Sequence, residues 1–191
     1  MATSTKERIM ETTAELFRRY GYTGTGMKQI VAEANAPFGS IYHFFPHGKA
    51  QLGEEVIRES GEMYRQLFEA IFEAAPDPVT AMSDFFLGAA ETLRQTDYAD
   101  ACPIETVALE VASSNEPLRK ATADVFESWI AAGTKRLTEA GLAQDRAREL
   151  AIAFIAALEG AFVLCRASRS TEALEVTGAQ MTEAVRAALA E

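Results

Sequence analysis

The sequence is poor in cysteine and histidine, and these shortages exclude several classes of protein. Its 191 residues hold two cysteines, Cys102 and Cys165, too few for the disulfide framework of a small secreted domain. Both histidines, His43 and His47, lie in the N-terminal quarter, so the rest of the chain has no imidazole for acid-base catalysis or metal binding. HExxH, GxSxG, CxxC and glycine-rich phosphate loops are absent as well. We therefore expect no enzyme, no catalytic residue, no metal and no cofactor.

Long apolar runs are also scarce. The most apolar stretch, Leu150 to Cys165, is interrupted by Glu159 and is shorter than the roughly 18 residues that a membrane span needs. The first ten residues, MATSTKERIM, lack the apolar run of a signal peptide. We expect a cytoplasmic protein that has no membrane partner.

Positive charge is in short supply over the chain as a whole. There are 18 Lys and Arg against 28 Asp and Glu, a net charge of −10, which argues against a general nucleic-acid binder. The balance is uneven, because residues 1–50 hold six basic and four acidic side chains and the rest of the chain holds 12 and 24. A slightly basic N-terminal region thus precedes an acidic body.

Helix-forming residues are what the sequence has in abundance, with 35 Ala, 22 Glu and only six Pro. The chain is therefore predicted to be all-α. Ser4 with Glu7 forms a capping-box spacing that predicts the start of a first helix, which Gly21 ends. Thr25 is expected to cap a short second helix. After the break at residues 35–37, a third short helix is expected over residues 38–44, which together give a helix-turn-helix.

The remaining helices are longer. Apolar residues at helical spacing predict a fourth helix over about residues 49–74. Beyond it, the breaks at proline, glycine and polar residues predict helices near residues 79–95, 103–113, 116–140, 145–168 and 171–190. No stretch alternates with a period of two, so no strand is expected.

The segment from Thr25 to Leu52, TGMKQIVAEANAPFGSIYHFFPHGKAQL, resembles the DNA-binding domain of the TetR family of transcriptional regulators. The matches, in order, are Thr25, Ile30, Ala34, Gly39, Ser40, Ile41, Tyr42, Phe45, Lys49 and Leu52, with one extra residue between Phe45 and Lys49. Asn35 replaces the usual glycine in a left-handed turn position, and Pro37 replaces a capping hydroxyl. The resemblance implies a helix-turn-helix domain over residues 1–48, a ligand-binding and dimerisation domain over 49–191, and about nine helices.

The candidate DNA contacts are Thr25, Lys28, Phe38, Gly39, Ser40, Tyr42, His43 and Lys49. The first two suit a phosphate at a helix start. Gly39 allows a close approach to the groove, while Ser40 can bond a base edge and Phe38 can pack on a thymine methyl. The last three suit phosphate contacts, which position a protein without reading sequence. Ile41 and Phe45 are expected to face the core with Leu16, Phe17 and Ile30.

A narrower resemblance is carried by Gly48, by Ala36-Pro37 and by the run Cys102-Pro103-Ile104-x-x-Val107-Ala108-Leu109-Glu110. These features resemble the LmrA/YxaF-like subgroup of the family. The resemblance implies a repressor of drug-efflux and resistance genes that leaves its double-stranded operator on binding a flat, mostly apolar small molecule.

The acidic, aromatic-rich body favours an apolar or cationic aromatic effector. The candidate lining is Phe68, Phe86, Phe126, Trp129, Phe154 and Leu158. Small residues are frequent in the last two expected helices, which suits close packing in a homodimer, and a homodimer fits a palindromic operator.

Some alternatives stay open at this point. The chain can be a helical enzyme or a lipophile carrier with a vestigial DNA-binding domain, or an activator with the same fold. Cys102, which precedes Pro103 at a helix start, is either a redox sensor or an inert small hydrophobe. Glu159 either bonds a ligand or a partner subunit, or lies exposed on its helix.

Overall fold

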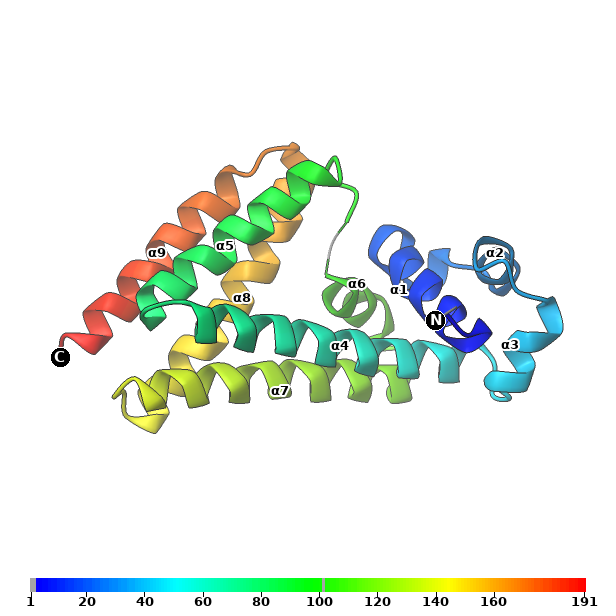
Figure 1. The fold of residues 1–191 in the computed structure, drawn as a ribbon, viewed down its shortest axis with the longest axis horizontal. Helices are drawn as coiled ribbons and strands as arrows, with labels where there is room; N and C mark the ends of the chain where they lie inside the picture. Colours follow the sequence, from blue (N-terminus) through cyan, green and yellow to red (C-terminus); the bar gives the residue numbers. More distant parts are fainter. Residues whose placement is uncertain (1–2, 101) are drawn as a thin grey trace. The chain divides into compact units, whose positions relative to one another are not determined.

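A computed structural model describes residues 3–100 and 102–191, and within those residues the chain is entirely helical (Figure 1). The helices are α1 (Thr5–Gly24), α2 (Met27–Glu33), α3 (Phe38–Phe44), α4 (Lys49–Ala74), α5 (Pro78–Gln95), α6 (Pro103–Val111), α7 (Glu116–Glu139), α8 (Gln144–Ser168) and α9 (Glu172–Leu189). The all-α prediction is confirmed for this part of the chain, and the bounds of α3 and α4 are those expected from the sequence.

The helices form two compact units. The first unit comprises Met1–Glu62 and Cys102–Val125, and the second comprises Met63–Ala101 and Phe126–Glu191. Helices α4 and α7 therefore contribute residues to both units. The functional boundary expected at residue 48 is a different kind of division, and it stays a prediction.

In the first unit, α1 packs against α2, α3 and α6, and α2 packs against α3. The predicted capping box starts α1, because the Ser4 hydroxyl accepts from the Glu7 amide at 3.2 Å and the Glu7 carboxylate accepts from the Ser4 amide at 2.7 Å. The side chains of Leu16, Phe17, Ile30, Ile41 and Phe45 are all buried, as expected. The helix-turn-helix thus has an apolar core of its own.

The junction between α1 and α2 differs from the expectation. Gly21 has a non-helical backbone with φ of 72°, so the regular helix is interrupted there although α1 resumes as far as Gly24. The prediction that Thr25 caps α2 is wrong: α2 begins at Met27, and Gly26 is its N-cap. The Thr25 hydroxyl instead donates to the Gly21 carbonyl four residues earlier at 2.7 Å, a local bond that threonine hydroxyls commonly make.

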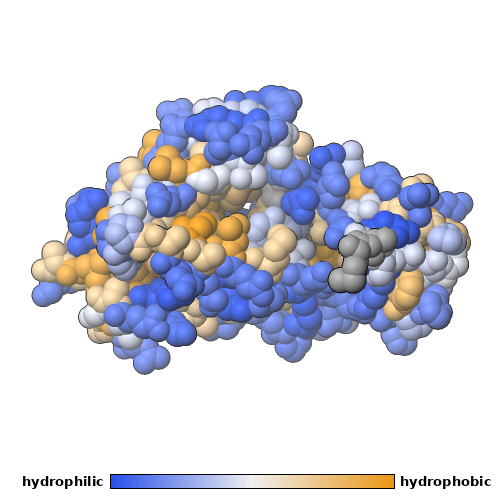
Figure 2. Space-filling model, viewed as in Figure 1, coloured by the Kyte–Doolittle hydropathy of each residue, from blue (hydrophilic) through white to orange (hydrophobic). Residues whose placement is uncertain are grey.

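In the second unit, α9 packs against both α5 and α8. The cap of α5 is Asp77, whose carboxylate accepts from the Thr80 amide at 2.9 Å. Phenylalanine and aliphatic side chains from α4, α5, α7, α8 and α9 form the core of this unit. Apolar surface also gathers over the part of the molecule that holds α5, α8 and α9 (Figure 2).

Helix α8 is long and apolar enough to cross a membrane by length and composition alone, which was not expected from the sequence. The expectation rested on the stretch from Leu150 to Cys165, which is interrupted by Glu159 and falls short of 18 residues, whereas an 18-residue window that tolerates up to two charged residues passes the test. In the structure 39% of that window is buried, and core helices of soluble proteins pass the same test. The observation is weak evidence for a membrane span.

Candidate nucleic-acid interface

The turn between α2 and α3 sets the direction in which α3 leaves α2. Asn35 adopts the left-handed conformation with φ of 47°, as the sequence predicts. Arg8 on α1 holds the same turn, because its guanidinium donates to the carbonyl oxygens of Ala34 at 3.2 Å and of Asn35 at 3.4 Å. Arg8 was not identified from the sequence, where a lone arginine in an amphipathic helix carries no specific signal.

Helix α3 separates its side chains into two faces. Ile41 is fully buried, and so is Phe45 at the helix end. Phe38 and Tyr42, one turn apart, are 47% and 49% exposed, and their ring centroids lie 5.7 Å apart. Gly39 and His43 are exposed as well. The outward face of α3 is therefore aromatic and open to solvent.

Gly39 has no role in the packing of the unit. A Cβ atom built there would meet no atom within 4 Å. Glycine is a weaker helix former than alanine, so helix propensity does not explain its presence here. An open position without a side chain does leave room for an external surface to come close to α3.

The remaining candidate DNA contacts are placed differently from one another. Lys28 is exposed on α2 and Ser40 is half-buried on α3. Thr25 is fully buried and its hydroxyl is already engaged, so its side chain does not offer a hydrogen bond to a phosphate. This corrects the expected role of Thr25.

Lys49, the first residue of α4, lies against the protein itself. Its Nζ is 4.3 Å from the centroid of the Tyr22 ring. Burial lowers the pKa of Lys49, and the negative charge of Glu110 acts in the opposite direction. Burial also raises the pKa of the Tyr22 hydroxyl. Any phosphate contact of Lys49 competes with this cation–π contact.

The six candidate effector contacts fall into two groups in the second unit. Phe68, Phe86, Phe154 and Leu158 are buried in its core. The Phe154 ring lies 5.9 Å from that of Phe68 and 5.6 Å from that of Phe86. Phe126 and Trp129 are half-buried, with ring centroids 5.6 Å apart, and Tyr64 packs on Trp129 at 6.2 Å. The structure thus assigns four candidates to the core and leaves two beside it.

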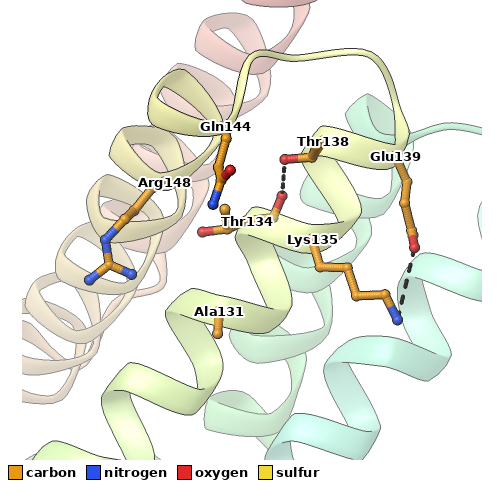
Figure 3. Close-up of a pocket in the computed structure, with 7 residues that line it drawn as sticks. All are labelled: Ala131, Thr134, Lys135, Thr138, Glu139, Gln144 and Arg148. Atoms are coloured by element: carbon orange, nitrogen blue, oxygen red, sulfur yellow. Dashed lines mark hydrogen bonds and ion pairs between the residues drawn. The ribbon is translucent and has the colours of Figure 1, made fainter.

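A groove of about 440 Å³ opens elsewhere in this unit, between the end of α7 and the start of α8 (Figure 3). Its lining consists of Ala131, Thr134, Lys135, Thr138, Glu139, Gln144 and Arg148. The two threonine hydroxyls donate to carbonyls of their own helix, and Arg148 makes a two-point ion pair with Glu127 at 2.8 and 2.9 Å. None of the six candidate effector contacts lines this groove, so their role stays a prediction.

Two further kinds of residue singled out in the sequence are buried. Glu159 is 8% exposed, which rules out the alternative that it lies on the open surface of α8. Cys102 is buried at the N-cap of α6, and Cys165 is buried in the core of the second unit. Both thiols are free of disulfide bonds.

Comparison with known proteins identifies the class. Residues 9–56 match the family model of bacterial regulatory proteins of the tetR family, and residues 78–180 match the C-terminal domain of LmrA/YxaF-like transcriptional regulators. The chain therefore belongs to the TetR family of helix-turn-helix transcriptional regulators. The resemblance of the segment from Thr25 to Leu52 is confirmed.

The relatives specify the branch of the family. The chain is 34% identical over 181 residues to the uncharacterized regulator YxaF of Bacillus subtilis, covering 95% of each chain. It is 32% identical over 173 residues to the regulator LmrA of the same strain, covering 90% of this chain and 92% of LmrA. A TetR regulator from Legionella pneumophila has the same fold, with a TM-score of 0.85 at 23% identity over 95% of this chain and 97% of that one.

Proposed function

We propose that the chain is a homodimeric repressor that binds a palindromic operator through α3 and leaves it when a small molecule binds the second unit. The observation that carries this proposal is the outward face of α3, where Phe38 and Tyr42 are about half exposed beside an open Gly39. In helix-turn-helix proteins, residues near the start of the second helix contact base edges in the major groove.

Within this proposal the candidate residues divide by position. Phe38, Gly39 and Ser40 at the start of α3 are suited to base edges. Tyr42, His43 and Lys28 are suited to phosphates, which orient the protein on the duplex. Lys49 is half-buried, and we keep it as a phosphate contact of smaller weight because its ammonium already contacts the Tyr22 ring. We no longer include Thr25 among the proposed DNA contacts.

An exposed apolar stripe on α8 supports the homodimer. Ile152, Ala156 and Gly160 recur every four residues, and Val163 and Leu164 follow three and four residues after Gly160. Leu164 is 61% exposed and Val163 is 49% exposed, in a protein whose net charge is −10. An apolar stripe with small residues suits the same helix of a second copy across a two-fold axis. The axis would set two α3 helices ~34–36 Å apart, the spacing of successive major grooves.

The proposed effector is a small apolar or cationic aromatic molecule. The acidic body disfavours anions. Phe126 and Trp129 are half-buried aromatics beside a core that contains the other four candidate contacts, and such side chains suit a flat aromatic ligand. We infer repression rather than activation from the likeness to the LmrA/YxaF-like branch. Because the proposed repressor acts on DNA, we place it in the cytoplasm.

A DNA retardation assay tests the proposal, with duplexes from the region upstream of the protein's own gene. We expect the wild-type chain to retard one of them, and Tyr42→Ala to weaken binding by on the order of tenfold. Because Tyr42 is uncharged, this variant is expected to keep the salt dependence of the wild-type chain, whereas Lys28→Ala is expected to make the log–log slope less steep by about 0.9 for the phosphate that it no longer neutralises.

Leu87→Ala is the matched control, because Leu87 is a 58% exposed apolar side chain on α5, outside the candidate interface. It is expected to bind DNA as the wild-type chain does. The proposal fails if the wild-type chain retards none of the duplexes, or if Leu87→Ala weakens binding as much as Tyr42→Ala.

A further inference from the structure

Glu110 reaches from α6 to the interruption in α1, a contact within the first unit. Its Oε2 accepts from the backbone amide of Thr23 at 2.6 Å, over a separation of 87 residues in the sequence. A hydrogen bond from an amide to a carboxylate is shorter and stronger than one between neutral groups. Glu110 ends the run that carries the resemblance to the LmrA/YxaF-like subgroup, and neither DNA contact nor effector binding explains it.

Gly21 lies directly against the Glu110 carboxylate. Its φ of +72° is a conformation that residues with a side chain rarely adopt. A Cβ built at this position would lie 1.7 Å from Oε1 of Glu110 and 2.8 Å from its carboxyl carbon. The carboxylate therefore occupies the space that a side chain at residue 21 would need.

The Glu110 carboxylate also affects the pKa of Lys49, the first residue of α4. The charge of Glu110 favours the protonated form of Lys49 and so raises the pKa that burial lowers. The Lys49 ammonium in turn lies over the ring of Tyr22. In the sequence, Tyr22 stands between Gly21 and Thr23, the two α1 residues that Glu110 approaches. One side chain of α6 thus acts on the end of α1 and on the first residue of α4.

The segment that Glu110 holds leads directly into the helix-turn-helix. The Thr25 hydroxyl bonds the Gly21 carbonyl at 2.7 Å, and Gly26 is the N-cap of α2. Residues 21–25 are thus fixed from one side by this internal bond and from the other by Glu110. The path by which α1 enters α2 depends on both contacts.

We infer that Glu110 is a positioning residue for operator binding, which holds residues 21–25 so that α2 and α3 leave α1 in one arrangement. This inference rests on the proposed DNA-binding function. A segment that is free to move must be ordered when DNA binds, and that ordering reduces affinity. The apolar core of the unit, with Phe17, Ile30 and Phe45, does not include Glu110, so we expect the fold to survive its removal.

The test compares Glu110→Ala, Glu110→Gln and Gly21→Ala in the full chain, on a duplex that the wild-type chain selects from a random library. We expect Glu110→Ala to weaken binding about 5-fold or more, in the range typical of coupling within a protein. Hydrogen exchange at the Thr23 amide is expected to quicken. Glu110→Gln keeps a carbonyl that accepts from Thr23, so it is expected to recover most of the affinity and of the protection.

Gly21→Ala breaks the same contact from the other side, because a methyl group displaces the carboxylate. We expect it to weaken binding at least as much as Glu110→Ala, because alanine at φ of +72° also strains the backbone. The double variant is expected to bind no more weakly than the weaker single variant, since both changes remove one interaction. Glu116→Ala is the control: this glutamate lies on α7 in the same unit and pairs with Arg119 of its own helix.

The outcomes separate the inference from the proposed function. Failure of the wild-type chain to select any duplex contradicts the DNA-binding function itself. If the wild-type chain binds and Glu110→Ala binds equally well despite faster Thr23 exchange, only the inference is overturned, and Glu110 is an anchor of the fold alone. If Gly21→Ala and Glu110→Ala multiply their effects, the two substitutions do not act through one shared contact, and the inference that Glu110 acts by holding residues 21–25 is overturned. If Glu110→Ala does not fold, Glu110→Gln and Gly21→Ala decide the question by the same two measurements.

Discussion

The two units use aromatic side chains in opposite ways. In the first unit the aromatic residues of the helix-turn-helix divide, because Phe17 and Phe45 are fully buried while Phe38 and Tyr42 are about half exposed on α3. In the second unit the aromatic residues that were expected to bind an effector mostly form the core. The candidate DNA-binding site is recognisable in the structure because its aromatic residues are exposed instead of buried in the core. The expected effector site is not recognisable in this way, because its residues are of the same types as the core residues.

The largest effect that tests this difference is on stability. Phe154 is 3% exposed and its ring contacts those of Phe68, Phe85 and Phe86, so we expect Phe154→Ala to lower the free energy of unfolding by about 3–5 kcal/mol. Phe38→Ala is expected to change it by less than about 0.5 kcal/mol, as for most surface substitutions. Urea unfolding of both variants measures the two values.

Equal losses of stability in the two variants would contradict the comparison. They would mean that Phe38 contributes to the fold, and that its exposure is no argument for DNA contact. A small loss for Phe154→Ala would mean that the aromatic core is loose enough to collapse around the missing ring. In that case the core of the second unit has room for a ligand.

The sequence predicted most of the helices because their signals are local. Ser4 with Glu7, and Asn35 in its left-handed turn, act over a few residues and both are found in the structure. The motif also identified the exposed residues of α3. It did not predict that the Thr25 hydroxyl turns inward, because a threonine hydroxyl can bond either an external phosphate or the carbonyl four residues earlier, and the motif does not separate the two.

The other missed features depend on contacts between distant residues. Glu110 stood out in the sequence only as the end of a resembling run, and its partner Thr23 lies 87 residues away. Lys49 was expected at a phosphate, but the Tyr22 ring is in reach once α1 and α4 are folded. For the effector site, phenylalanines in the core and in a pocket have the same spacing along a helix. Periodicity therefore predicted where the aromatics gather without separating the two roles.

A smaller effect is expected for the outer face of the second unit, where α8 is apolar and exposed. Ala156→Glu places a charge in the proposed dimer interface, and a two-fold axis brings it near its own copy. We expect self-association to weaken by on the order of a hundredfold or more, since like charges across an interface cost several kcal/mol. Sedimentation at several protein concentrations measures the change.

Ala123→Glu is the control for this substitution. It adds the same charge to an exposed alanine of α7 in the first unit, and it is expected to leave self-association unchanged. The proposed interface is wrong if both variants associate like the wild-type chain. If Ala156→Glu is monomeric and still binds a palindromic duplex with full affinity, the dimer is not required for operator binding.

The smallest effect concerns Trp129. This side chain is half-buried, so its exposure is intermediate between that of the buried core aromatics and that of the exposed aromatics on α3. It is the only tryptophan in the chain, and its ring packs edge-on against those of Phe126 and Tyr64. A flat aromatic cation that inserts beside this ring changes its surroundings, so we expect the emission of Trp129 to shift as the ligand saturates. Trp129→Ala is expected to weaken ligand binding about tenfold, within the range typical of aromatic contacts with a desolvated cation. Trp129→Phe, which keeps a ring, is expected to weaken it less.

Calorimetry follows binding independently of emission in all three proteins. If calorimetry reaches saturation while emission stays constant and Trp129→Ala binds as tightly as the wild-type chain, the effector does not contact this pair. The ligand would then bind elsewhere in the second unit, either in the groove between α7 and α8 or inside the core by opening the buried cluster around Phe154.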